Sequence, residues 1–218
     1  MPFTTDQFFA LFAAYNQAIG PAPIVAYVLA ALALAAMLSG CAAGYRVALG
    51  ILGLLWLWNG AAYHLVFFTR INGAAYGFAV LFVVQGGLFL WLAARAASGR
   101  AIRRRVLQVA TGSSLVAYGA ILYGILGRLS GYAWPAIPLF GVAPCPTVIF
   151  TFGLLMLAPR RVASWLLIVP LVWAAIGSSA AILLSVPEDL GLLVSGLIVA
   201  GWLIVRATQR GSRDKQAA

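Results

Sequence analysis

The sequence predicts an all-α protein, a polytopic transmembrane bundle of seven helices with the N-terminus outside and the C-terminus in the cytoplasm. Hydrophobic residues make up 64% of the 218 residues and charged residues only 8%, whereas soluble domains average about 45–50% and about 25%. Apolar windows of about 20 residues, the length that crosses a bilayer, recur along almost the whole chain. Threading these windows alternately collects the basic residues on one face. We therefore expect one membrane domain over residues 1–218.

The predicted spans each contain about 19–24 residues, as a bilayer core of roughly 30 Å requires. They cover residues 21–40, 45–68, 73–94, 106–126, 138–158, 162–184 and 187–205. The segment from Thr4 to Ala18 is too short to cross. The capping-box spacing of Thr4 and Gln7, followed by an apolar face, predicts a short amphipathic helix in the membrane interface. Because the first nine residues contain no basic region and no cleavage site, we expect no signal peptide.

The fifth segment, residues 138–158, has the weakest span signal. Its continuous apolar run is only residues 148–158, and Pro138, Gly141, Pro144 and Pro146 precede that run. A re-entrant hairpin here is the alternative and would give six crossings. It would also carry the basic tail, residues 206–218, to the outside, so the seven-span model agrees better with the charge pattern.

Basic residues concentrate on one predicted face, which the positive-inside rule assigns to the cytoplasm. Of the 14 lysines and arginines, those on this face are Arg46, Arg95, Arg100, Arg103, Arg104, Arg105, Arg160, Arg161, Arg206, Arg210, Arg213 and Lys215. Anionic lipid headgroups are the partners expected there. A run of three arginines is too small a footprint to indicate nucleic-acid binding. The expected location is the inner (cytoplasmic) membrane of a bacterial cell.

The outer end of the second predicted helix carries the first candidate ligand-binding residues. Asn59 and Tyr63 are four residues apart, which places them on one stripe of the helix, with His64 beside them and Arg70 and Asn72 just beyond. An amide as deep as Asn59 must be hydrogen-bonded. His64 is the only histidine and could titrate or bind a metal. The alternative is an ordinary group of interfacial polar residues.

Cys145 is the candidate nucleophile or metal ligand. If Pro146 is the first residue of a helix, Cys145 is the N-cap, facing free N–H groups and the positive end of the helix dipole. That environment would favour the thiolate. The preceding loop, residues 128–143, is rich in glycine, proline and aromatic residues and could form a rigid lid. The alternative is an inert cysteine in a proline turn.

Glu188 and Asp189 are the candidate charge partners of a ligand. Their structural interpretation is strong: Ser185 as N-cap and Glu188 three residues later have capping-box spacing, and both acids suit a helix N-terminus. One of the two acids could still face inward. No acidic or basic residue is predicted mid-span, which disfavours a proton-coupled pump.

Segments from all parts of the chain together resemble a family of bacterial multi-spanning membrane proteins known only as a domain of unknown function. The segments that carry the resemblance are residues 2–9, 15–16, 63–72, 143–151, 176–178 and 187–190. The resemblance implies that these positions follow the family's pattern, and it implies no activity, cofactor or substrate.

The predicted topology brings the candidate residues from distant segments to one face. We therefore expect a binding or transport protein for a small ligand or metal ion, with its site on the periplasmic side. His64 and Cys145 would contact the ligand, and Glu188 or Asp189 would balance its charge. The alternatives are a membrane enzyme or redox protein that uses Cys145, and an accessory subunit of a membrane complex. The sequence leaves the cofactor and any homo-oligomer or complex partner open and disfavours an enzyme, since it has no zinc-ligand cluster or hydrolase motif.

Overall fold

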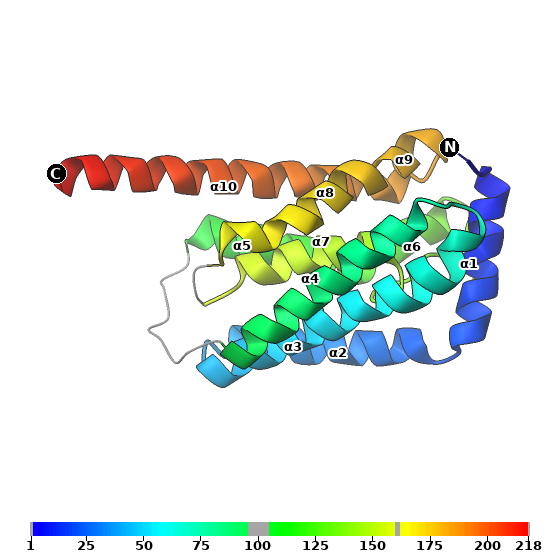
Figure 1. The fold of residues 1–218 in the computed structure, drawn as a ribbon, viewed down its shortest axis with the longest axis horizontal. Coiled ribbons are helices and arrows are strands. Elements are labelled where there is room, and N and C mark those ends of the chain that lie inside the picture. The colour runs from blue at the N-terminus through cyan, green and yellow to red at the C-terminus, as the bar shows by residue number, and fades with distance from the viewer. Residues whose placement is uncertain (1, 96–104, 160–161, 218) are drawn as a thin grey trace.

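The computed structural model describes residues 2–95, 105–159 and 162–217, and within them it contains helices and no strand. Helical rods run alternately between the two ends of an elongated bundle (Figure 1). The rods are α2 (Ala22–Leu38), α3 (Ala42–Trp58) with η1 (Asn59–Phe67) and η2 (Phe68–Arg70), α4 (Ala75–Arg95), α5 (Val106–Ala117) with η3 (Tyr118–Leu122) and α6 (Tyr123–Leu129), α7 (Pro144–Met156), η4 (Ser164–Leu167) with α8 (Ile168–Gly177) and α9 (Ser179–Leu183), and η5 (Pro187–Asp189) with α10 (Leu190–Ala217). The α-helical bundle predicted from the sequence is confirmed.

Five helical segments of the described chain are long and apolar enough to cross a membrane. They are Ala42–Arg70, Ala75–Arg95, Val106–Leu129, Ser164–Leu183 and Pro187–Gln209. A sixth is possible if α1 (Thr5–Ile19) and α2 count as one bent span, and α7 is apolar but shorter. The chain therefore has the lengths and composition of a membrane-embedded protein.

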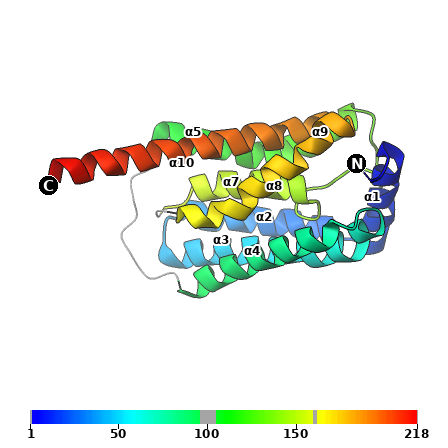
Figure 2. The ribbon, with the colours of Figure 1, turned by 45° about the horizontal axis from the view of Figure 1, so that its top comes forward.

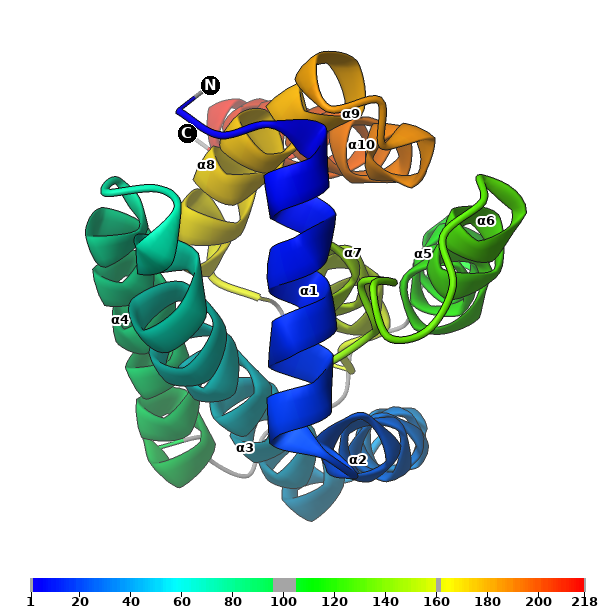
Figure 3. The same cartoon turned by 90° about the vertical axis from the view of Figure 1, so that its right-hand side faces the viewer.

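The N-terminal helix α1 lies across one end of the bundle, as Figures 1 and 3 show. The predicted capping box is present: the Gln7 backbone N–H donates to Thr4 Oγ1 at 3.2 Å, and the Thr4 N–H donates to Gln7 Oε1 at 2.9 Å. Gly20, with φ of 53°, ends the helix, and α2 leaves at 82° to it. The apolar face of α1 is buried against the bundle.

The short helix α7 occupies the centre of the bundle, and α3, α5, α8 and α10 pack against it (Figures 2 and 3). Twelve of its 13 residues are buried. Because neighbouring helices cover it on every side, its uniformly apolar sequence faces protein rather than lipid. Of the predicted fifth span, residues 138–143 are not helical, so that boundary was wrong.

Residues 135–142 are not helical, and polar side chains from other helices fix their backbone by hydrogen bonds. Asn16 Nδ2 donates to the carbonyl oxygens of Pro135 and Ile137 at 2.6 and 2.8 Å, and Asn59 Nδ2 donates to that of Gly141 at 2.9 Å. Tyr15 adds a bond to the Val142 carbonyl at 2.9 Å. These bonds satisfy backbone groups that would otherwise be buried without partners.

Most of the described basic residues lie at one end of the bundle. Arg46, Arg95 and Arg105 lie at the ends of α3, α4 and α5 that are remote from α1, and Arg206 reaches the Val162 carbonyl at the same end. We call this the basic end, and the end that α1 crosses the cavity end. Arg70 and Arg128 lie at the cavity end, as expected. Arg100, Arg103, Arg104, Arg160 and Arg161 lie outside the described residues.

Candidate ligand-binding cavity

A cavity of about 130 Å³ lies at the cavity end, beneath α1 and the residues that precede it. Residues from most rods of the bundle line it, and its wall is mainly aromatic. The rings are those of Phe3, Phe8, Phe12, Tyr63, Phe68, Phe78, Tyr123 and Trp173. An engineered cavity of about 150 Å³ holds one benzene molecule, so this space suits a ligand of similar size.

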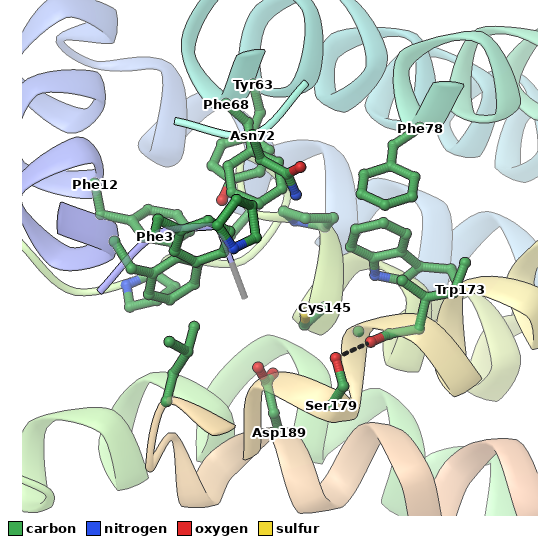
Figure 4. A pocket seen from close by; sticks show the side chains of 18 of the residues that line it. Phe3, Phe12, Tyr63, Phe68, Asn72, Phe78, Cys145, Trp173, Ser179 and Asp189 are labelled. Atoms are coloured by element: carbon green, nitrogen blue, oxygen red, sulfur yellow. Dashed lines mark hydrogen bonds between the residues drawn. The ribbon is translucent and has the colours of Figure 1, made fainter. Parts of the chain in front are cut away.

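Asp189 supplies the acidic group of the cavity. It is 1% exposed, and the Tyr123 hydroxyl donates a hydrogen bond to its Oδ1 at 2.6 Å. The Cys145 thiol also hydrogen-bonds to this carboxyl group. Figure 4 shows Asp189 and Ser179 on one side of the space, Cys145 beside them, and Phe3, Tyr63 and Phe68 on the other side. Three segments far apart in the sequence thus form one polar cluster in an aromatic cavity.

The predicted N-cap role of Cys145 was wrong. The helix α7 begins at Pro144 with Ala143 as its N-cap, so Cys145 lies inside the first turn. Its side chain hydrogen-bonds to the Asp189 carboxyl group and lies against the Trp173 indole.

The capping box predicted at Ser185 was also wrong. The N-cap of η5 is Val186, and no side chain caps that helix. Ser185 instead has φ of 56°, a left-handed backbone conformation that is rare for a residue with a side chain. This turn directs Asp189 to the cavity.

Glu188 is buried beside the cavity but does not line it. It is 1% exposed, and neither of its carboxyl oxygens has a hydrogen-bond partner among the described residues. Its Oε1 would lie 3.0 Å from a β-carbon placed at Gly127, so α6 and η5 are in close contact there. Burial, and then the nearby Glu188 carboxyl, raise the pKa of the Tyr132 phenol on the adjoining loop.

His64 lies behind the cavity wall. It is fully buried, and its ring centroid is 4.6 Å from that of Phe82, 4.9 Å from that of Trp173 and 5.1 Å from that of Tyr63. Neither ring nitrogen has a hydrogen-bond partner in the described part of the chain. The structure therefore brings Tyr63, Cys145 and Asp189 together in one cavity and leaves His64 outside it.

The metal hypothesis for His64 and Cys145 gains no support from the geometry. Among the described residues, no group of three or more His, Cys, Asp or Glu side chains is placed to hold a metal ion. A protein zinc site uses at least three such ligands.

The other predicted site residues divide between the wall and the scaffold. Asn72 lines the cavity, and its Oδ1 accepts the Ala74 N–H at 3.1 Å. Asn59 holds the loop at Gly141 and the Leu55 carbonyl. Arg70 is exposed and stacks on the Phe67 ring at 4.4 Å.

Phe3, Tyr123 and Trp173 line the cavity and were not predicted from the sequence. Phe3 and Trp173 lie in apolar segments, where aromatic residues are ordinary. Tyr123 carried the one usable signal, a phenol near the outer end of a predicted span, because a buried phenol needs a hydrogen-bond partner.

The helical bundle and its aromatic, acidic cavity define a membrane-type helical protein with a cavity at one end of the bundle. The chain belongs to a family of unknown function (DUF6064), whose model matches residues 5–215. No curated protein and no solved structure matches the chain.

Proposed function

We propose that the protein is a membrane-embedded binding protein whose cavity holds one small, mostly apolar molecule. The observation that carries this proposal is the combination of a cavity of about 130 Å³, an aromatic wall and one cluster of polar groups. Ligand sites of proteins are typically apolar with a few placed polar groups, which orient the ligand. The Tyr123, Cys145 and Asp189 cluster would do so here.

Binding agrees with the packing better than passage through the bundle does. The axis of the bundle is filled by α7, whose residues from Pro146 to Met156 are all buried. A path to the basic end would have to displace this closely packed helix, and interiors at crystal-like density do not deform continuously. The enzyme alternative is weaker as well, because Cys145 contacts a carboxyl group and not the positively charged environment that activates a thiol.

The proposal includes a topology of seven crossings with the cavity end on the periplasmic side of the bacterial inner membrane. Two features support it: successive rods of the bundle alternate in direction (Figure 1), and Arg46, Arg95, Arg105 and Arg206 gather at the basic end. Basic residues collect on the cytoplasmic side, where anionic lipids would be their partners. In this topology α1 lies in the outer interface.

Filling the cavity tests the proposed function. Ser179→Phe would place a phenyl group in a space suited to one ring. Ser114→Phe, on the exposed side of α5, is the matched control. Saturation-transfer NMR with benzyl alcohol, on protein in lipid nanodiscs, should show saturable binding by the wild-type and control proteins. Ser179→Phe should weaken that binding at least about tenfold, because about 1.4 kcal/mol of lost contact suffices.

Equal binding by Ser179→Phe and Ser114→Phe would contradict the proposal, because the probe would then occupy another place. Non-saturable uptake by all three proteins would contradict it as well. Gel filtration and thermal unfolding of each variant establish that the fold is retained before the comparison is made.

A further inference from the structure

The charged side chains at the cavity are acidic. Asp189 lines it and is 1% exposed. The preceding residue, Glu188, is equally buried, and neither of its carboxyl oxygens has a hydrogen-bond partner among the described residues. Among the described residues that line the cavity, there is no lysine, arginine or histidine. Burying a carboxylate without a cation is costly. A ligand that brings positive charge would remove that cost.

The groups that contact Asp189 do not supply a cation. Tyr123 donates a neutral O–H at 2.6 Å and Cys145 a neutral thiol. Arg70 and Arg128, the basic residues of the cavity end, are exposed. The carboxyl group is thus oriented by two donors and left without a counter-charge from the described residues of the wall.

The opposite side of the cavity suits a cation that carries an apolar body. Trp173 lies at the wall with Phe78 against it, their centroids 5.2 Å apart, and Phe3 and Phe68 lie 5.5 Å apart. Aromatic faces attract ammonium groups within about 6 Å, and tryptophan attracts them best. Figure 4 shows Asp189 across the space from the rings of Phe3 and Phe68.

We propose that the ligand is a small organic monocation, an ammonium group on an apolar body about the size of one aromatic ring. The ammonium group would lie at Asp189 and the apolar body among the rings. This inference rests on the proposed function and adds the chemical class of its ligand. A transition-metal ion such as zinc would lack the further ligands it needs, since no cluster of three acidic, thiol or imidazole side chains exists in the described residues.

A charge series on one molecular frame tests the inference. Benzylammonium, benzyl alcohol and benzoate share the ring and differ in charge at neutral pH. We expect wild-type protein in nanodiscs of zwitterionic lipid to bind benzylammonium at least about tenfold more tightly than benzyl alcohol, and benzoate most weakly; a ratio of ten is about 1.4 kcal/mol. Empty nanodiscs measure partition of each probe into the lipid.

The Asp189→Asn variant assigns the preference to the carboxyl group. It keeps the shape of the side chain and removes its charge, so the ratio of benzylammonium affinity to benzyl alcohol affinity should fall at least about tenfold towards one. Asp6→Asn, at an exposed acid of α1, is the matched control and should keep the preference. If Asp189→Asn does not fold, the wild-type charge series alone decides the inference.

The outcomes separate the two proposals. Wild-type protein that binds benzyl alcohol as tightly as benzylammonium, or binds benzoate best, would overturn the cation inference and leave the cavity as a neutral binding site. A preference that survives in Asp189→Asn would overturn it also. Saturable binding of none of the three probes would overturn both the inference and the proposed function.

Discussion

The buried polar residues near the cavity differ in whether their side chains find hydrogen-bond partners. Asn59 and Asn16 donate to carbonyl oxygens of the loop before α7, and Tyr123 donates to Asp189. His64 has no hydrogen-bond partner for either ring nitrogen within the described chain, and aromatic rings surround it. A buried polar group without a hydrogen bond costs about 1–3 kcal/mol. The unpaired nitrogens of His64 therefore lower the stability of the fold, although its ring fills space in the core.

His64→Phe is therefore expected to leave the free energy of unfolding unchanged or to raise it by about 1 kcal/mol, because a ring of similar shape replaces unpaired nitrogens. Thermal or denaturant unfolding in detergent micelles measures this. The reverse change at a neighbouring position, Phe82→His, buries new polar atoms and should destabilise the protein.

Benzyl alcohol binding should survive His64→Phe, since His64 does not line the cavity. A folded His64→Phe protein that no longer binds the probe would restore the sequence-based hypothesis that His64 contacts the ligand.

At the scale of the elements, the position of the cavity depends on how closely α5 and η3 approach α7. A β-carbon at Gly153 of α7 would lie 2.6 Å from the Gly112 carbonyl oxygen and from the Val116 nitrogen, both backbone atoms. A β-carbon at Gly119 would lie 2.7 Å from the Pro146 carbonyl oxygen. Small residues allow helices in membranes to approach at backbone distance. This contact brings Tyr123, one turn after Gly119, to the start of α7.

Gly153→Ala is expected to lower the free energy of unfolding by about 1–3 kcal/mol, because an added methyl group forces two backbones apart. Gly124→Ala is the matched control: its β-carbon would meet nothing within 4 Å, and alanine favours a helix over glycine by up to about 1 kcal/mol. Unfolding in mixed micelles should thus move in opposite directions for the two variants. Equal shifts would show that the α5–α7 contact is looser than described.

At the scale of the whole molecule, the two cysteines mark opposite ends. Cys41 is exposed at the basic end, between α2 and α3, and hydrogen bonds with Ser39 and from the Gly44 N–H lower the pKa of its thiol. A lowered thiol pKa increases the thiolate fraction at neutral pH and with it the rate of labelling. Ser130 follows α6 at the cavity end. These positions report the proposed orientation.

We expect a membrane-impermeant thiol reagent to label a Ser130→Cys thiol in intact cells, in a Cys41→Ser, Cys145→Ser background. Cys41 in a Cys145→Ser protein should react only after the membrane is made permeable. The cause is the positive-inside rule acting on the basic end. Rapid labelling of Cys41 in intact cells would contradict the orientation, and labelling of both positions would contradict an odd number of crossings between them.

Much of the fold could be predicted from the sequence, because a helix that is exposed to lipid needs an apolar segment long enough to cross the bilayer. The starts of α1 and α2, the rods of α3 and α4 and the broken rod Ser164–Leu183 fall within a few residues of the predicted segments. The Thr4 capping box is local and was predicted correctly. The fifth segment was misjudged at its start, because the bonds from Asn16 and Asn59 that hold residues 135–142 come from other helices.

The site was only partly predictable for the same physical reason. The sequence by itself determined that the protein is helical and apolar, that its basic residues gather at one end, and that the candidate site residues lie towards the other. Only the tertiary structure decided which groups share a cavity. It turned His64 away behind Trp173, paired Cys145 and Tyr123 with Asp189, and closed the space with Phe3. Helix length and charge are properties of single segments, whereas a cavity exists only where side chains of several segments fail to fill the space between them.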